Sequence, residues 1–399
     1  MAVFIAGISE CGAVLPGFDF TDQPAASNGW ALGPNYSSSG NAMLLVNPHL
    51  YWGGLETFYE AHFLLPNTNL YGVALVGSPV LQIAFNDHLG WTHTVNPMDG
   101  CDLYHLRLAG SAFDDGYVLD NQVHSFVTTY ETIQIRQSDG SMTSEILHIR
   151  RAKQGPVTEM NGQVLAVRLA LLETSLLAGM NRQWWQMGQA RSLQEFQATL
   201  QKGHLPLFNV IYADRNKNIM LAFNGIIPVR PEGDTAFWQM PVPGDDASLI
   251  WENSYAYNDL PKSINPSSGW VQNSNSAPWY MTMPFLDRNE YPSNIAANVI
   301  NNRELRGLQM LNEHPHMSYA ELMTAKHSTH ALVADQVLDE LMAAARDSDD
   351  PLLVKAAEVF EHWNRQYLAE SRGGPLFYRW LEKWLDKTIA QAANTHPNY

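Results

Sequence analysis

The chain has 399 residues, 45% of them hydrophobic, with 12 Trp and 15 Phe. This composition excludes a disordered chain and predicts either two domains or one large layered domain. The formal net charge of −16 disfavours nucleic acid and anionic membranes as partners, because both require a basic surface. Only Cys11 and Cys101 are present, which excludes a disulfide framework or a cysteine-rich zinc site but allows one disulfide.

The beginning of the chain predicts neither a membrane span nor a signal peptide. Residues 1–17 are apolar but lack a basic start, which a signal peptide needs. The longest apolar stretch, residues 70–85, is interrupted by Gly, Ser, Pro and Gln, whereas a spanning helix needs roughly 20 nearly continuous apolar residues. Residues 1–26 are rich in Gly, Pro and small residues and are interpreted as a loop or linker.

The first half of the chain predicts short strands. They are bounded by Gly, Pro, Asn and Asp, and they cover residues 42–46, 58–65, 71–76 and 81–85. Apolar residues on both faces predict a sheet that is covered on both sides. Two longer strands, over 123–136 and 143–150, are joined at Asp139-Gly140, which is a strong hairpin signal.

The second half predicts one more hairpin and then helices. A capping box, Ser192 to Glu195, starts a helix, and residues 214–218 join strands over 208–213 and 219–223. Residues 228–295 are interpreted as a long, functional loop region. A second capping box begins at Ser318, and amphipathic helices are predicted over 351–366 and 375–393. Strands first and helices last predict an α+β fold.

Ser27 is the first candidate for chemistry. It lies between the linker and an apolar, strand-like run, and it has neither a Gly-x-Ser-x-Gly elbow nor a Ser-x-x-Lys pattern around it. As a nucleophile it therefore needs another base. The α-amino group of a serine freed at a chain terminus, with a pKa of about 8, can serve. From composition alone, a plain turn serine is the commoner case.

Other candidates each have a structural alternative. His49 follows Asn47-Pro48 and either caps a strand end or positions another group. His93, between two threonines, can be a hydrogen-bonded core residue. Asn273 and Asn275 lie in a Trp-flanked loop, where side-chain amides either stabilise an oxyanion or form Asx-turns.

An acidic loop offers the one candidate metal site. Asp99 and Asp102 lie three residues apart and could hold calcium through their carboxylates and a backbone carbonyl. Asp-rich loops more often simply form turns.

Several long motifs, in order, resemble the β-subunit start of the penicillin acylase family. The motifs cover residues 27–33, 44–50, 58–62, 77–87, 90–95, 209–214 and 272–275. The family includes penicillin, cephalosporin, cyclic-lipopeptide (aculeacin-type) and acyl-homoserine-lactone acylases. The resemblance extends from residue 27 to about 315, and it is specific for the family but weak on the substrate.

The resemblance implies an N-terminal-nucleophile hydrolase with a four-layer αββα core, followed here by C-terminal helices. Residues 1–26 would be the end of a linker or propeptide, and residues 27–399 an acylase β-subunit. A precursor would cleave itself between Ala26 and Ser27. Ser27 would then attack an amide carbonyl through Oγ, with its own α-amine as the base, through a water.

The same resemblance assigns the remaining site residues. Val95 would give a backbone N–H to the oxyanion hole, and Asn275 a side-chain donor, with Asn273 the less favoured choice. His49 would orient the nucleophile and its amine. Arg303 would lie near the oxyanion asparagine.

The resemblance implies no cofactor for catalysis and at most one structural calcium ion. Its ligands would be Asp99, the carbonyl of Cys101 and Asp102, with Pro228 and Asp287 as weaker candidates. The metal would take no part in the chemistry.

The resemblance also implies partners and a compartment. An α-subunit of the same precursor would precede the linker, and the β-subunit would continue further, so the chain is expected to be a fragment. The substrate would be a small acyl amide, and His49 favours a fatty-acyl group on a homoserine lactone or lipopeptide over a β-lactam side chain. Family members are usually exported to the periplasm or beyond.

Two alternatives stay open. The chain could be a non-catalytic remnant that keeps the fold and binds a partner or ligand, although the set Ser27, His49, Val95, Asn275 and Arg303 is intact. A carbohydrate-binding β-module could use the 12 Trp as stacking platforms, but the helical end of the chain fits that poorly.

Overall fold

The computed structural model describes residues 26–395, apart from 112, 161, 171–175 and 232. The chain divides into two compact units, residues 1–318 and 319–399. The strands are β1 (Ala26–Leu32), β2 (Met43–His49), β3 (Phe58–Leu65), β4 (Thr68–Leu75), β5 (Ile83–Asn86), β6 (Leu89–Val95), β7 (Cys101–His105), β8 (Tyr117–Leu119), β9 (Gln122–His124), β10 (Val127–Arg136), β11 (Met142–Arg151), β12 (Val157–Met160), β13 (Gln163–Leu169), β14 (Phe208–Asp214), β15 (Ile219–Phe223), β16 (Val242–Pro243), β17 (Lys262–Ile264) and β18 (Trp270–Asn273). The α-helices are α2 (Leu176–Gln189), α3 (Leu193–Leu200), α4 (Thr235–Trp238), α5 (Asn302–Glu313), α6 (Tyr319–Lys326), α7 (Leu332–Arg346), α8 (Pro351–Glu361) and α9 (Gly373–Thr395).

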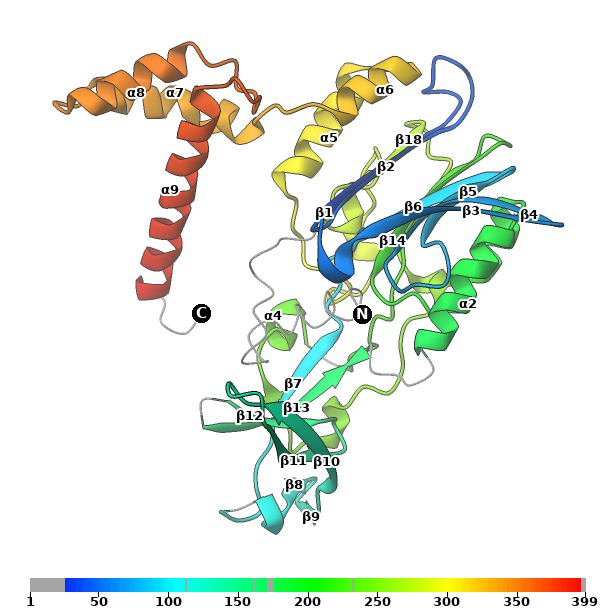
Figure 1. Ribbon diagram of the computed structural model, residues 1–399, viewed down its shortest axis with the longest axis vertical. Helices are drawn as coiled ribbons and strands as arrows, with labels where there is room; N and C mark the ends of the chain where they lie inside the picture. Colours follow the sequence, from blue (N-terminus) through cyan, green and yellow to red (C-terminus); the bar gives the residue numbers. More distant parts are fainter. Residues whose placement is uncertain (1–25, 112, 161, 171–175, 232, 396–399) are drawn as a thin grey trace. The chain divides into compact units, whose positions relative to one another are not determined.

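Two sheets form the centre of the first unit (Figure 1). A seven-stranded antiparallel sheet has the order β17-β15-β14-β6-β5-β4-β3, and a three-stranded sheet has the order β18-β1-β2. The sheets approach each other closely at Gly29 on β1, where a Cβ atom would lie 3.0 Å from Ile211 and 3.1 Å from Thr92. Glycine at this position therefore allows the strand that carries Ser27 to lie directly on β6 and β14.

Helices cover the outer faces of both sheets. Trp184 of α2 donates its indole N–H to Nε2 of His93 on β6 at 3.0 Å, so α2 packs on the seven-stranded sheet. Gly307 of α5 lies against Gln272 of β18, so α5 packs on the three-stranded sheet. The resulting order of helix, sheet, sheet and helix confirms the predicted four-layer αββα core (Figure 1).

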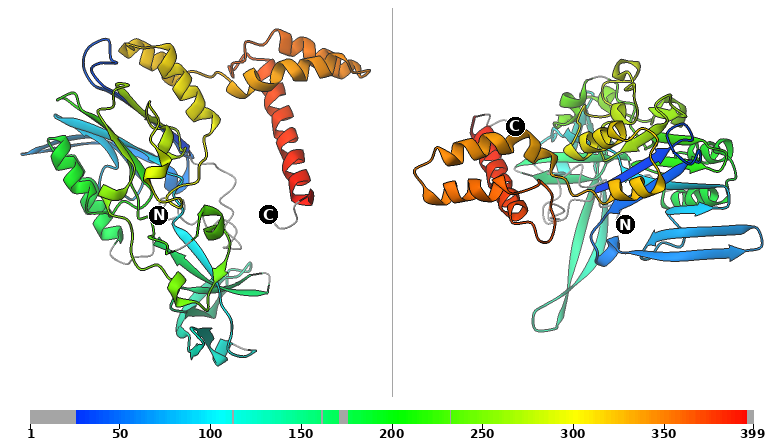
Figure 2. Two further views of the ribbon diagram at one scale, coloured as in Figure 1. Left: turned by 180° about the vertical axis from the view of Figure 1, so that it is seen from behind. Right: turned by 90° about the horizontal axis from the view of Figure 1, so that it is seen from above.

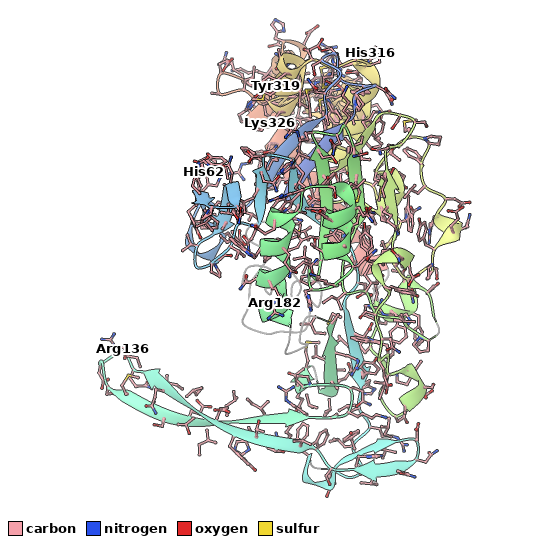
Figure 3. All side chains as sticks on the ribbon, turned by 90° about the vertical axis from the view of Figure 1, so that its right-hand side faces the viewer. His62, Arg136, Arg182, His316, Tyr319 and Lys326 are labelled. Carbon is pink, nitrogen blue, oxygen red and sulfur yellow. The ribbon has the colours of Figure 1, made fainter. Side chains whose placement is uncertain are left out.

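A second group of strands extends the first unit. A four-stranded sheet of order β12-β13-β7-β16 has its own core of aromatic and aliphatic side chains, among them Tyr104, Trp238 and Trp251. From it a long hairpin of β10 and β11 reaches outward with Arg136 at its tip (Figure 3). The single strand predicted over residues 123–136 is two strands in the structure, β9 and β10.

Most predicted elements are confirmed, including the β14–β15 hairpin and the helix after Ser192, whose hydroxyl accepts from the N–H of Glu195 at 3.2 Å. The prediction that the early strands are covered on both faces is wrong for β3. This strand is the edge of its sheet, and Leu64 is 68% exposed. Figure 2 shows β3 and β4 running out beyond the three-stranded sheet.

The second unit is helical, as predicted. Helices α7, α8 and α9 pack around a core that includes Leu338, Phe360 and Phe377. The helix predicted over 351–366 ends earlier, at Glu361, and that predicted over 375–393 is longer, from Gly373 to Thr395. Throughout the described part of the chain, every helix is too short or too polar to cross a bilayer.

Candidate active site

Ser27 lies on β1, and its backbone is bonded by side chains rather than by a strand. Its N–H donates to Oδ1 of Asn275 at 2.7 Å, and its carbonyl accepts from Nη1 of Arg303 at 3.0 Å. Ser27 pairs with Pro48 of β2 in the register. Since both backbone groups of Ser27 point away from β2, this is a non-hydrogen-bonded pair, and a proline without an N–H is tolerated there.

The asparagine that faces Ser27 comes from the turn after β18. Asn273 ends the strand, and its Oδ1 accepts from the N–H of Asn275 at 2.8 Å in an Asx-turn. Asn275 has a φ of 68°, a left-handed conformation that Asn tolerates better than most residues. The turn directs Asn275 toward Ser27, whereas Asn273 stays buried as the centre of the turn.

Hydrogen-bond partners determine the orientation of the Asn275 amide. Its Oδ1 faces two donors, the N–H of Ser27 at 2.7 Å and Nη2 of Arg303 at 2.9 Å. Its Nδ2 donates to the carbonyl of Val95 at 2.7 Å. The opposite assignment would place donor against donor at one end and acceptor against acceptor at the other. One N–H of Nδ2 remains to donate elsewhere.

Arg303, in the first turn of α5, connects three groups around the serine. Besides Ser27 and Asn275, its Nη1 donates to Oδ1 of Asn28 at 2.7 Å. Burial lowers the pKa of the guanidinium, but arginine stays cationic in proteins. A fixed positive charge therefore lies against the Ser27 carbonyl and against the Asn275 oxygen that accepts from the Ser27 N–H.

The hydroxyl of Ser27 lies beside the peptide bond that precedes it. Its Oγ donates to the carbonyl oxygen of Ala26 at 2.6 Å, and the residue is 5% exposed. His49, the last residue of β2, pairs with Ala26 in the register. The five residues Ser27, His49, Val95, Asn275 and Arg303 thus come from β1, β2, β6, the turn after β18 and α5, and they converge around the Ala26–Ser27 bond.

Comparison with known proteins identifies the family. The family model for penicillin amidase matches residues 8–397. The chain belongs to the penicillin amidase family. Among solved structures, a thermostable penicillin G acylase from Alcaligenes faecalis superposes with a TM-score of 0.70 at 20% identity, covering 86% of this chain and 60% of that one. This likeness supports the N-terminal-nucleophile hydrolase fold.

Relatives within the penicillin amidase family carry several names. An acyl-homoserine lactone acylase PvdQ of Pseudomonas fluorescens is 24% identical over 88% of this chain and 48% of its own length. The aculeacin-A acylase of Actinoplanes utahensis is 29% identical over 59% of this chain and 30% of its own length. The chain thus spans about half the length, or less, of these curated relatives.

Two polar groups of the site were missed in the sequence. Asn209 of β14 donates to Oγ1 of Thr94 and to Oδ1 of Asn273, both at 3.0 Å. Thr94 also donates to Oδ1 of Asn273 at 2.6 Å. This buried network holds the turn of Asn273 against β6, and Asn209 lay within a motif quoted only for resemblance.

Glu304 is the other missed residue, fully buried next to Arg303. Its carboxylate accepts from Nε2 of Gln272 at 2.7 Å and from the N–H of Ser274. Burial raises the pKa of Glu304 to about 8, while the Ser274 N–H, Arg303 and Gln272 oppose the shift. The pattern Asn301-x-x-Glu304 was a usable signal, since Asn301 caps α5 by accepting from the N–H of Glu304 at 3.0 Å.

His93 is a core residue. Its Nε2 accepts from Trp184, and its Nδ1 lies 3.3 Å from the carbonyl of Asn209, which indicates the tautomer protonated at Nδ1. Burial lowers the pKa of His93 to about 4, so the ring is neutral at physiological pH. On β6 it faces α2, whereas Thr92 and Thr94 face the other sheet.

The predicted calcium ligands Asp99 and Asp102 both contact the guanidinium of Arg230. Nε of Arg230 lies 3.1 and 3.0 Å from the two oxygens of Asp102, and Nη2 lies 3.1 Å from Oδ1 of Asp99. Trp251 donates its indole N–H to Oδ2 of Asp102 at 2.6 Å. The backbone carbonyl of Asp99 also accepts from Arg230, at 2.9 Å.

Calcium takes six to eight oxygen ligands around one point, whereas here the two carboxylates face a guanidinium. Arg230 takes the position of the cation, and nowhere among residues 26–395, with the gaps given above, do three or more His, Cys, Asp or Glu gather to hold a metal. Asp287 accepts from the N–H of Asn289 in its own turn. Calcium binding in this member of the penicillin amidase family stays a prediction.

A cavity of about 840 Å³ lies between β2 and strands β4 to β6. Its lining includes Leu44, Val46, Tyr71 and Phe85, and it contains none of the five residues around the Ala26–Ser27 bond. It marks a part of the inner sheet face that the three-stranded sheet leaves uncovered.

Proposed function

We propose that this chain is the nucleophile-bearing subunit of an acylase that hydrolyses linear amides. The observation that supports it best is the environment of Ser27. Its N–H and carbonyl are bonded by Asn275 and Arg303, and its hydroxyl lies on the carbonyl of Ala26. A buried serine in an ordinary strand would use its backbone groups in the ladder instead.

The first reaction would be cleavage of the chain itself. Oγ of Ser27 attacks the carbonyl carbon of Ala26, the C–N bond breaks, and the proton of the hydroxyl passes to the Ser27 nitrogen. Water then hydrolyses the resulting ester, which leaves a carboxylate on Ala26 and a free α-amine on Ser27. The contact of 2.6 Å between Oγ and the Ala26 oxygen supports this proposal because it places the hydroxyl beside the carbonyl group that it would attack.

The second reaction would be acyl transfer from the substrate. Oγ attacks the amide carbonyl, the α-amine takes the proton and gives it to the leaving amine, and water releases the acyl group. The charge of Arg303 disfavours protonation of that amine and so keeps it available as a base. The remaining N–H of Asn275 Nδ2 and the N–H of Val95 would stabilise the oxyanion, and one such donor is worth about 10²–10³ in rate.

We further propose a fatty-acyl substrate, such as an acyl-homoserine lactone or an acylated lipopeptide. His49 opposite the Ala26–Ser27 bond supports it, and so do relatives named acyl-homoserine lactone acylase and aculeacin-A acylase. A β-lactam side chain is the competing substrate.

A partner subunit of the same precursor is part of the proposal. Large apolar side chains are exposed, among them Trp52 after β2, which is 97% exposed, Leu65 at the end of β3, and Phe85, which lines the cavity. Exposed apolar surface of this kind marks a contact with another polypeptide. The disulfide at Cys101 supports an oxidising compartment, the periplasm or the outside of the cell.

The intact mass of the expressed chain tests the reaction. The full chain is expressed with the α-subunit of an acyl-homoserine lactone acylase relative, alongside Ser27→Ala as the control. We expect a new N-terminus at Ser27 in the wild type and an uncut Ser27→Ala chain. A wild-type chain that stays uncut and inactive would identify a non-catalytic member of the family.

Competition between two amides tests the substrate. The cleaved protein should hydrolyse a dodecanoyl amide in preference to a phenylacetyl amide, measured by release of the amine. A strong preference for the phenylacetyl amide would overturn the fatty-acyl assignment and leave the acylase proposal intact.

A further inference from the structure

The first turn of α5 carries two opposite charges, which contact different parts of the turn from Asn273 to Asn275, the catalytic turn. Arg303 contacts Ser27 and Asn275, whereas Glu304 points the other way, into the backbone that leads to Asn275. Glu304 is fully buried, and so are the residues it contacts, Gln272 and Ser274. A buried carboxylate is costly unless it is hydrogen-bonded, so its place here needs a reason.

The donors around Glu304 are unambiguous. Ser274 contributes a backbone N–H, which only donates. Gln272 directs Nε2 both to Glu304 at 2.7 Å and to the carbonyl of Tyr280 at 3.2 Å. Because Tyr280 contributes an acceptor, the amide nitrogen of Gln272 must face Glu304 as well. Both carboxyl oxygens therefore accept, one bond each.

The start of α5 opposes part of the effect of burial on this carboxyl group. Glu304 lies in the first turn, where the free N–H groups of a helix attract negative charge. Arg303 adds a positive charge next to it in the chain. The elements packed around the carboxylate contribute neutral donors, the side-chain amide of Gln272 on β18 and the backbone N–H of Ser274.

The contacts of Glu304 bracket the residue that shapes the catalytic turn. Gln272 and Ser274 flank Asn273, whose Oδ1 bonds the N–H of Asn275. Asn301 completes the attachment, since its Nδ2 donates to the carbonyl of Ser274 at 2.6 Å. Asn275 has a positive φ, and such a conformation persists only where its surroundings hold it.

We propose that Glu304 is a positioning residue for the oxyanion asparagine. It binds the segment from Gln272 to Ser274 to the start of α5, so that Asn275 keeps one N–H directed to the reacting carbonyl. This inference rests on the proposed acylase function. It assigns to Glu304 an effect on the rate of the chemical step rather than on the binding of substrate.

The test compares Glu304→Gln with Glu313→Gln in the full chain, expressed with the α-subunit as above. Glutamine keeps the size of the side chain, but its amide nitrogen would face a donor at Ser274 or at Gln272. Glu313, at the exposed end of the same helix, is the control. Self-cleavage is followed by intact mass, and kcat and KM are measured on the dodecanoyl amide.

We expect Glu304→Gln to slow self-cleavage and to lower kcat about 10- to 100-fold with KM within about threefold, because small displacements of a catalytic group have effects of that size. Glu313→Gln should match the wild type. Equal kcat values in the two variants would overturn the inference. An uncut, inactive wild type would instead overturn the proposed function, and this inference with it.

A second variant covers the case in which Glu304→Gln does not fold. Gln272→Met removes one of the two donors and leaves Glu304, Ser274 and the cap of α5 in place. We expect kcat to fall about three- to tenfold at constant KM, since the bonds of Ser274 to Glu304 and to Asn301 remain. A Gln272→Met protein with wild-type kcat would overturn the inference as well.

Discussion

Glu304 and Asp102 are both fully buried carboxylates, and they are compensated in different ways. Asp102 faces the full charge of Arg230, through two contacts of 3.1 and 3.0 Å, and a third bond from Trp251. Glu304 faces only neutral N–H groups of Gln272 and Ser274. The arginine next to it in the chain is directed to Ser27 instead.

The pKa values follow this difference. Burial raises the pKa of Asp102 to about 6, with Arg230 opposing the shift, whereas burial raises the pKa of Glu304 to about 8. A carboxylate that faces a cation is neutralised by it, and the pair joins two segments of the chain. Near Ser27, by contrast, Arg303 bonds to Ser27 and Asn275. The carboxyl group of Glu304 is bonded only by the N–H groups of Gln272 and Ser274 and lies at the start of α5.

The largest effect is expected at Arg230. Arg230→Met leaves the buried Asp102 and the half-buried Asp99 without their cation, and breaking a buried pair in this way costs about 3–5 kcal/mol. Unfolding in urea measures the loss. The control is Arg107→Met, which breaks an exposed pair with Asp245, the side chains being 56% and 38% exposed, and should cost at most about 1 kcal/mol. Similar losses of unfolding free energy in Arg230→Met and Arg107→Met would show that the buried pair contributes no more to stability than the exposed one.

A smaller effect is expected from pH at Glu304. The folded-state pKa of about 8 lies above the ordinary 4.5, so unfolding releases a proton at intermediate pH. The contribution of Glu304 to stability is therefore complete below about pH 4.5 and is lost as pH rises to about 8, by on the order of a few kcal/mol.

Urea unfolding of the wild type and Glu304→Gln at several pH values between these limits measures this loss. The stability of the wild type relative to the variant should fall as pH rises. For Asp102 the corresponding window is lower and narrower, from 3.8 to about 6. A difference between wild type and Glu304→Gln that stays constant with pH would contradict the account of Glu304.

The smallest effect is expected at Trp251. Trp251→Phe removes the indole N–H that donates to Asp102 at 2.6 Å, while Arg230 stays in place. Loss of one hydrogen bond to a charged group costs about 1.5–3 kcal/mol. Trp52→Phe, on the exposed surface, is the control and should change the free energy of unfolding by less than about 0.5 kcal/mol. A cost at Trp251 as large as that of Arg230→Met would show that the indole, not the cation, holds Asp102.

Local patterns predicted some elements well and others not at all. The β14–β15 hairpin and the capped start of α3 depend on neighbours in the chain, and both were found where predicted. β18 was not predicted, because it has only four residues within the stretch interpreted as a loop. α5 was not predicted, because charged and amide residues make up much of its length and leave few apolar positions to show a helical period.

By itself, the sequence determined the hairpin at residues 214–218 and the capped helix after Ser192, because these depend on local hydrogen-bonding and turn chemistry. Its ordered motifs, through their resemblance to the penicillin acylase family, determined the family and the four-layer core. Only the tertiary structure decided that the Asn275 amide oxygen accepts from the Ser27 N–H, that Arg230 faces Asp102, and that Glu304 accepts from Ser274. These contacts join residues 30 to 248 positions apart. They arise from strand register and from the burial of charge, which a chain expresses only once its layers have packed.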